Sequence, residues 1–140
     1  MLGTGHTGLV LGHQLGSDLC EWVPQARAFA KVGYPVLAAA TRIRPPVAGV
    51  VSLSGPSGFG GVDAQGAMAR LRVPVLFVVA ADDQHFTEQA RVMYRAARVR
   101  DKRLLVVPGG GHGTSMVEFG EDAPRVLATL RRFIADHTRP

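Results

Sequence analysis

The sequence predicts an α/β protein: a three-layer α/β/α sandwich with a mostly parallel sheet of about five strands. Two observations support this class. Short, continuous apolar runs, typical of parallel strands buried on both faces, alternate with segments whose apolar residues recur at helical spacing. Polar candidate residues follow several of these runs directly, at the sheet edge where α/β proteins place their functional groups.

The first part of the chain is expected to hold three strands and one helix. The strands are predicted at residues 8–12, from Val36 onward, and at 47–53. A helix is expected over residues 19–32, with Gly33 fitting its C-terminal cap. Its apolar positions recur at helical spacing: Trp22, Ala26, Phe29 and Ala30.

The second part alternates helices with two further strands. A short helix is expected over 63–71, a strand over 75–80 and a second strand over 103–107. Thr87 is a suitable N-cap for a helix reaching Val99. The last helix is expected over 121–137, with the apolar stripe Val126, Leu127, Leu130, Phe133 and Ile134.

Length and composition predict one globular domain over residues 1–140. Hydrophobic residues make up 46% of the chain and charged residues 19%, which excludes a disordered protein. No apolar run is long enough to span a membrane, and the first residues lack the charged region of a signal peptide. Cys20 is the only cysteine and is expected to be a small core residue. We therefore expect a cytoplasmic protein without a membrane partner.

The positive charge raises the question of nucleic-acid binding. The formal net charge is +5, with 14 arginines and 2 lysines. The arginines are scattered at spacings typical of solvated helix faces, and no aromatic residues interleave with them as stacking platforms. A basic nucleic-acid-binding domain is therefore the lowest-ranked hypothesis.

One connection is too short for the expected fold. Nine residues, Ala38–Pro46, separate the strand ending at Leu37 from the strand beginning at Val47. A parallel crossover normally needs a dozen or more residues, including a helix. The letters Ala-Ala-Ala-Thr-Arg-Ile resemble the end of a helix whose beginning is missing.

An acid and a histidine each follow a predicted strand. Asp83 comes after the run ending at Ala80, and His112 lies among glycines after the run ending at Val107. This order matches the second half of a Ser…Asp…His triad, but no Gly-x-Ser-x-Gly turn occurs in the chain. His6, His85 and His137 lack metal-ligand spacing with any cysteine or acid, so no metal or cofactor is expected.

Five segments resemble the α/β-hydrolase superfamily, nearest to its dienelactone-hydrolase-like and small esterase-like members. The segments are Gly8–Gly16, Glu21–Leu37, Val47–Pro56, Val73–Asp83 and Pro108–Gly113. The resemblance implies a reduced α/β-hydrolase fold. It further implies that Asp83 orients the imidazole, that His112 is the general base, and that Gln14 and Leu15 form the oxyanion loop.

The resemblance also locates what is missing. In that family the strand, nucleophile elbow and helix lie between the segments represented here by Leu37 and Ala38, so we infer an internal deletion of about sixty residues there. Ser54 is the one serine just past a strand that could substitute as nucleophile, although it lacks the flanking glycines of an elbow. Ser57 also fails on spacing, and Ser115 is expected to be a cap or loop residue.

Two functional hypotheses lead. The first is a protein of ester or lactone hydrolase ancestry that keeps Asp83 and His112 but has weak or no activity on small ester-like substrates. The second is a non-catalytic remnant that binds a partner, including a second copy of itself, through an exposed sheet edge. The substrate is not indicated, because the segment that normally builds much of the pocket is also missing.

Overall fold

The computed structural model describes residues 8–11, 19–34, 36–38, 47–59 and 61–138. The chain divides into two compact units, residues 1–46 with 138–140 and residues 47–137, which are described separately below. The α/β class expected from the sequence is confirmed. The single domain and the internal deletion stay predictions, and residues 39–46, next to the inferred junction, lie outside the described residues.

The N-terminal unit contains two short parallel strands and one helix. Strand β1 (Leu9–Leu11) pairs with β2 (Val36–Ala38). A 3₁₀ turn, η1 (Leu19–Trp22), leads into α1 (Val23–Lys31), so only the later part of the expected helix is α-helical. The helix buries Ala26 and Phe29, two of its four expected apolar positions. Cys20 lies in the 3₁₀ turn and is exposed, so the prediction of a core cysteine is wrong.

The second unit is built on a three-stranded parallel sheet. Its order is β3 (Val50–Leu53), β6 (Val75–Ala80), β7 (Lys102–Val107). All six residues of β6 are buried, because β6 has a strand on each side and helices on each face. The expectation of about five strands in one sheet is wrong. Among the described residues β1 pairs only with β2, so the five parallel strands fall into separate sheets of two and three.

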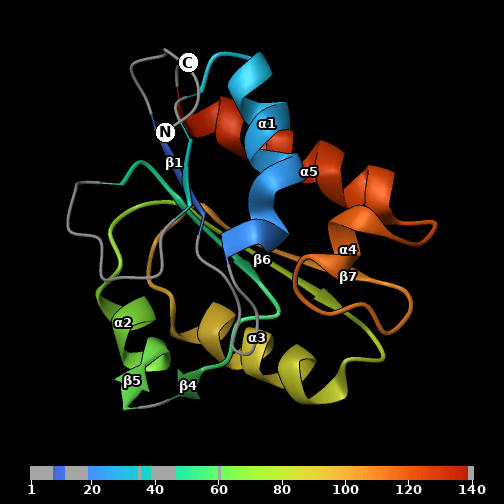
Figure 1. Ribbon diagram of the computed structural model, residues 1–140. Coiled ribbons are helices and arrows are strands. Elements are labelled where there is room, and N and C mark those ends of the chain that lie inside the picture. The colour runs from blue at the N-terminus through green and yellow to red at the C-terminus, as the bar shows by residue number, and fades with distance from the viewer. Residues whose placement is uncertain (1–7, 12–18, 35, 39–46, 60, 139–140) are drawn as a thin grey trace. The chain divides into compact units, whose positions relative to one another are not determined.

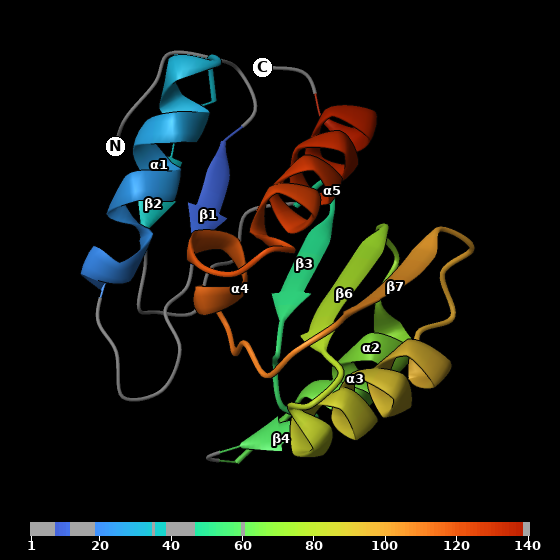
Figure 2. The ribbon, with the colours of Figure 1, turned by 90° about the vertical axis from the view of Figure 1, so that its right-hand side faces the viewer.

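Helices cover both faces of this sheet, which gives three layers (Figure 1). Helix α3 (Gln84–Ala96) packs on the face that holds Val75, Phe77 and Val79 of the central strand. Helices α4 (Ser115–Glu118) and α5 (Ala123–His137) pack on the face that holds Leu76, Val78 and Ala80. Figure 2 shows the two helical layers on either side of the three strands. Alternate side chains of β6 therefore enter two apolar clusters, one on each face of the sheet, and these clusters form the core of this unit.

A short hairpin and a helix join β3 to β6. Strands β4 (Gly58–Phe59) and β5 (Val62–Asp63) pair antiparallel. Helix α2 (Ala64–Arg70) follows at once, and the Asp63 carboxylate accepts a 2.7 Å hydrogen bond from the Gly66 amide. Asp63 is therefore both a strand residue and the N-cap of α2.

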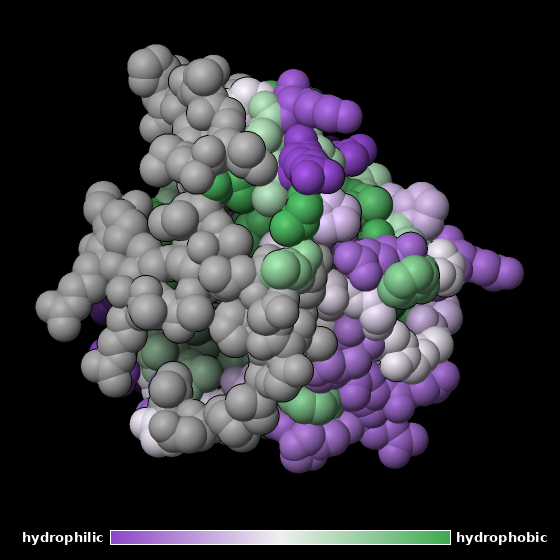
Figure 3. Space-filling view, viewed as in Figure 1, coloured by the Kyte–Doolittle hydropathy of each residue, from purple (hydrophilic) through white to green (hydrophobic). Residues whose placement is uncertain are grey.

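The outer surface of α3 is hydrophilic. Glu88 forms ion pairs with Arg91 and Arg95, and all three side chains are more than half exposed. Figure 3 shows hydrophilic surface over this helix, in purple. In the described part of the chain, no helix is both long and apolar enough to cross a membrane.

Candidate active site

The acid of the site lies in the turn between β6 and α3. Asp83 is the N-cap residue of α3, so the helix begins at Gln84 and the predicted cap at Thr87 is wrong. The Asp83 side chain makes no capping bond to its own helix. Instead its Oδ2 lies 2.8 Å from Nδ1 of His112. A carboxylate in this position would ordinarily cap the helix, so its orientation toward the histidine is a specific feature of the turn.

A buried threonine holds the acid turn in place. The Thr87 hydroxyl lies 2.6 Å from the carbonyl oxygen of Ala80 and 3.0 Å from that of Asp83. The Thr87 amide also donates to the Asp83 carbonyl, at 2.9 Å. Thr87 thus ties the end of β6 to the first turn of α3, and it fixes the backbone from which the Asp83 carboxylate projects.

The histidine lies on the loop that follows β7. Gly109 and Gly113 adopt positive φ angles of 82° and 56°, which favour glycine. A side chain at Gly111 would press on Met116, since a Cβ there would lie 3.0 Å from Met116 Cγ. The glycines around His112 therefore allow a tight loop that passes close over α4.

Ser115 closes this loop around the histidine backbone. Its Oγ accepts a 2.8 Å hydrogen bond from the His112 amide and donates one of 2.8 Å to the His112 carbonyl. Ser115 was expected to be a cap or loop residue, and the structure places it directly behind the candidate base. The sequence signal was the i to i+3 spacing of His112 and Ser115, which is typical of a hydroxyl bonding to its own turn.

Backbone hydrogen bonds hold the acid and histidine loops together. The ladder between β6 and β7 continues past the strand ends, because the Ala81 amide donates to Val107 O at 2.8 Å. The Asp82 amide then donates to Gly109 O at 2.9 Å. Asp82 itself is exposed, so of the two adjacent acids only Asp83 faces the histidine.

The pair is partly shielded from solvent. The side chain of Asp83 is 15% exposed and that of His112 is 38% exposed. The ring of Phe86, from the first turn of α3, meets the His112 ring edge to face at a centroid distance of 4.4 Å. Phe86 was not among the expected site residues, because its position facing His112 depends on where α3 begins.

Ser54 directly follows β3 and makes no hydrogen bond to the pair. It is 2% exposed, and its Oγ has no hydrogen-bond partner among the described residues. Its φ of +49° is the one positive value among described non-glycine residues. A side chain at the following Gly55 would require the Ser52 hydroxyl to move, because its Cβ would contact Ser52 Oγ. No interaction of the described residues joins Ser54 to Asp83 or His112.

Of the three remaining candidate residues, one is hydrogen bonded to a different residue and two lie outside the described residues. Ser57 is engaged through its amide and hydroxyl, which donate to Gln89 Oε1 at 2.7 and 3.1 Å. Gln14 and Leu15, the expected oxyanion residues, lie outside the described residues. In the part of the chain that the structure describes, no three His, Cys, Asp or Glu side chains gather as a metal site.

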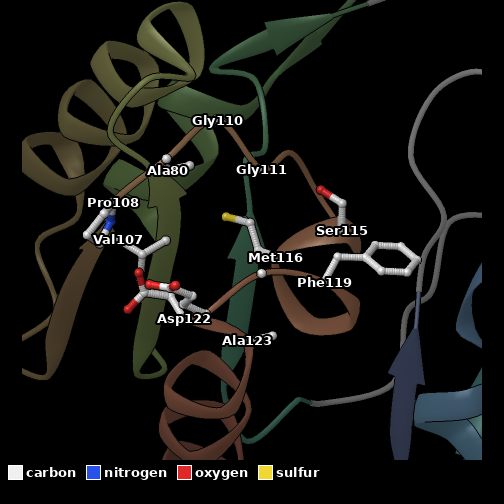
Figure 4. Close-up of a pocket in the computed structure, with 13 residues that line it drawn as sticks. Ala80, Val107, Pro108, Gly110, Gly111, Ser115, Met116, Phe119, Asp122 and Ala123 are labelled. Carbon is white, nitrogen blue, oxygen red and sulfur yellow. The ribbon is translucent and has the colours of Figure 1, made fainter.

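A cavity of about 400 Å³ lies beside the histidine loop (Figure 4). Its walls include the loop backbone from Pro108 to Gly111 and the side chains of Met116, Phe119 and Ala123. Glu121 and Asp122 add acidic groups. Phe119 is 72% exposed, which is unusual for so large an apolar side chain. The cavity shares a loop with His112, although neither member of the pair lines it.

Comparison with models of known protein families found no match, and no curated protein matches the sequence.

Proposed function

We propose that this chain is a protein of α/β-hydrolase ancestry that hydrolyses small ester or lactone substrates weakly, using Asp83 and His112. The observation that carries the proposal is the 2.8 Å contact between Asp83 Oδ2 and His112 Nδ1, made by residues that follow two adjacent parallel strands. Such a pair orients an imidazole for proton transfer at its other nitrogen.

The hydrogen-bond pattern favours a base over a structural ion pair. A carboxylate only accepts hydrogen bonds, so Nδ1 of His112 carries the proton in the neutral ring and Nε2 holds the lone pair. Nε2 makes no hydrogen bond among the described residues, and the side chain is 38% exposed. Nε2 is therefore available to take a proton from water that attacks an acyl carbon.

The rate is expected to be low, because no serine of the described residues is joined to Nε2. Ser54 is buried, Ser57 bonds to Gln89, and Ser115 bonds to the His112 backbone. The absence of a Gly-x-Ser-x-Gly turn from the sequence agrees with this. Without a positioned hydroxyl, the pair cannot react through an acyl-serine intermediate, and it lacks most of the rate enhancement of a complete Ser-His-Asp triad.

The substrate class follows from the chemistry of the pair and from the neighbouring cavity. The cavity, of about 400 Å³, is within the range of small-molecule pockets, and its walls include the apolar side chains of Met116 and Phe119. One cysteine and no disulfide suit the cytoplasmic setting that the sequence argument favours.

Hydrolysis of p-nitrophenyl acetate by purified protein tests the proposal. We expect slow turnover above the buffer rate that is lost in His112→Ala and retained in Ser54→Ala. Turnover lost in Ser54→Ala would instead identify Ser54 as the nucleophile. Equal rates for the parent protein and a folded His112→Ala variant would contradict the proposal.

Self-association through β3 is the second candidate function. The four residues of β3 are half-buried and uncharged, whereas β7, at the other side of the sheet, begins with Lys102 and Arg103. Edge strands usually carry charges that oppose pairing, and β3 has none. Val47, just before β3, is 46% exposed. A dimeric mass in solution that shifts to a monomer in Val47→Lys would favour this candidate.

A further inference from the structure

We propose that His112 itself acts as a covalent nucleophile, through Nε2, toward acyl donors whose leaving groups are weakly basic, such as aryl esters. This inference rests on the proposed function and replaces its attacking water with the imidazole for one class of substrate. It assigns a temporary acyl group to a residue that the hydrolase resemblance makes only a base.

The first support is the fixed tautomer of His112. Asp83 Oδ2 lies 2.8 Å from Nδ1 and accepts a hydrogen bond from the Nδ1–H, which leaves the lone pair on Nε2. Unlike His112, His137 has both ring nitrogens in hydrogen-bond contact, at 2.7 Å with Phe133 O and 2.9 Å with Asp101 Oδ2. His112 is therefore a histidine with a defined and unoccupied nucleophilic nitrogen.

The second support is the fixed position of the ring. Ser115 bonds both the amide and the carbonyl of His112 at 2.8 Å, and Phe86 packs against the ring at 4.4 Å. Asp83 provides the third fixed point. An imidazole held at three points loses little freedom on reaching a transition state, which raises its effective concentration toward a bound acyl group.

The chemistry balances without any further reactant than water. Nε2 attacks the acyl carbon, the phenolate leaves with the bonding electron pair, and an acyl-imidazolium forms whose Nδ1 proton remains hydrogen bonded to Asp83. The Asp83 carboxylate stabilises this cation. Water then attacks the acyl carbon, and the carbon–Nε2 bond breaks with its electron pair returning to Nε2. One proton of the water passes through solvent to the departed phenolate, so the products are a carboxylic acid, a phenol and the original imidazole.

The same step defines the substrate class. When the tetrahedral adduct collapses, the weaker base leaves first. A phenolate of low basicity leaves in preference to the imidazole, whereas an alkoxide does not, and an alkyl ester is then simply regenerated. Aryl esters are therefore expected to react through Nε2, and alkyl esters are expected to be left to the slower water route.

Stopped-flow reaction with excess p-nitrophenyl acetate, followed by mass analysis of quenched protein, tests the inference. We expect a burst of p-nitrophenolate, a transient acetyl group mapped to His112 and released by hydroxylamine, and little solvent deuterium isotope effect on the burst. Ethyl acetate should give no acetyl adduct. Asp83→Asn should slow the burst by about tenfold or more. The side-chain amide can donate a hydrogen bond to Nδ1, and the proton of the neutral ring then lies on Nε2 and removes its lone pair.

His85→Ala is the matched control, since His85 is exposed and its ring centroid lies 5.2 Å from that of the same Phe86. It should leave the burst unchanged. Hydrolysis that depends on His112 but shows no acetyl adduct and a full isotope effect would overturn the inference and leave the proposed function standing. No His112-dependent hydrolysis would overturn both, and an acetyl group on Ser54 would overturn the role given to Nε2.

Discussion

Nδ1 of His112 lies 2.8 Å from Oδ2 of Asp83, although 29 positions separate the two residues in sequence. The contact is possible because β6 and β7 are parallel neighbours that end at the same edge of the sheet. The acid also forgoes the capping bond that its place at the start of α3 offers. This one relationship carries the functional account, and the predictions below test the parts that support it.

The choice of acid is tested by two single substitutions. We expect Asp83→Asn to reduce p-nitrophenyl acetate hydrolysis by about tenfold or more, because the carboxylate sets the imidazole tautomer. Asp82→Asn is the matched control, since Asp82 is exposed and contributes its backbone amide to the loop. An equal loss of rate in both variants would mean that hydrolysis depends on negative charge near the loop and does not depend on the Asp83–His112 hydrogen bond.

Ser115 is expected to position His112 through the loop backbone. Ser115→Ala removes both bonds to His112, and we expect unfolding free energy to fall by about 1 kcal/mol, with a several-fold loss of hydrolysis. Thr129→Ala is the control, since it removes a single exposed hydroxyl bond of similar length, 2.9 Å to Arg125 O, on α5 and away from the pair. Full activity in a destabilised Ser115→Ala protein would show that hydrolysis does not depend on the two hydrogen bonds of Ser115.

The buried hydroxyl of Thr87 is expected to stabilise the acid turn. Thr87→Val keeps the shape but leaves the Ala80 carbonyl without this partner, so unfolding free energy should fall by about 1–3 kcal/mol. Thr87→Ser retains the hydroxyl, so its unfolding free energy should fall clearly less than that of Thr87→Val. Urea denaturation of both variants measures the difference, and a loss in Thr87→Ser as large as that in Thr87→Val would show that the methyl group matters as much as the hydroxyl.

Ser54 combines backbone strain with a buried hydroxyl that has no hydrogen-bond partner among the described residues. Ser54→Gly should therefore raise unfolding free energy by about 1 kcal/mol, because glycine tolerates the φ of +49° and leaves no hydroxyl to satisfy. Ser54→Ala keeps the backbone strain, so its unfolding free energy should rise by less than that of Ser54→Gly. A loss of stability in Ser54→Gly would show that the hydroxyl has a partner in solution.

An acid-sensitive network ties the start of β7 to the end of α5. Hydrogen bonds from Arg103 and His137 lower the pKa of Asp101 from its ordinary value of 3.8. The stability that this lowering provides is present above that value and is lost as the pH falls through the lower folded-state pKa. Thermal unfolding followed from neutral to strongly acidic pH should show this loss. Asp101→Asn should flatten that part of the profile, and an unchanged profile would exclude Asp101 as its source.

The sequence predicted the central features of the second unit well, because they depend on local patterns. The run Val75–Ala80 is continuous and apolar, and it forms the buried central strand. The apolar stripe of the last helix supplies Val126, Leu130 and Phe133 to the core. The order of acid and histidine after neighbouring strands was also visible from the chain.

Other features depend on contacts that local patterns do not encode. Helix α3 begins three residues before the expected cap, because Thr87 bonds back to the end of β6 instead of starting the helix. The partition of the parallel strands into two sheets is a matter of pairing between distant segments. Phe86 could not be identified as a neighbour of His112 until the start of α3 was known.

The central claim is that the Asp83–His112 pair is a working hydrolytic pair. The most direct test is the rate of p-nitrophenyl acetate hydrolysis by the parent protein and by His112→Ala, with folding of both verified by circular dichroism. The account predicts slow turnover in the parent protein and the buffer rate in the variant. Equal rates in two folded proteins would contradict it.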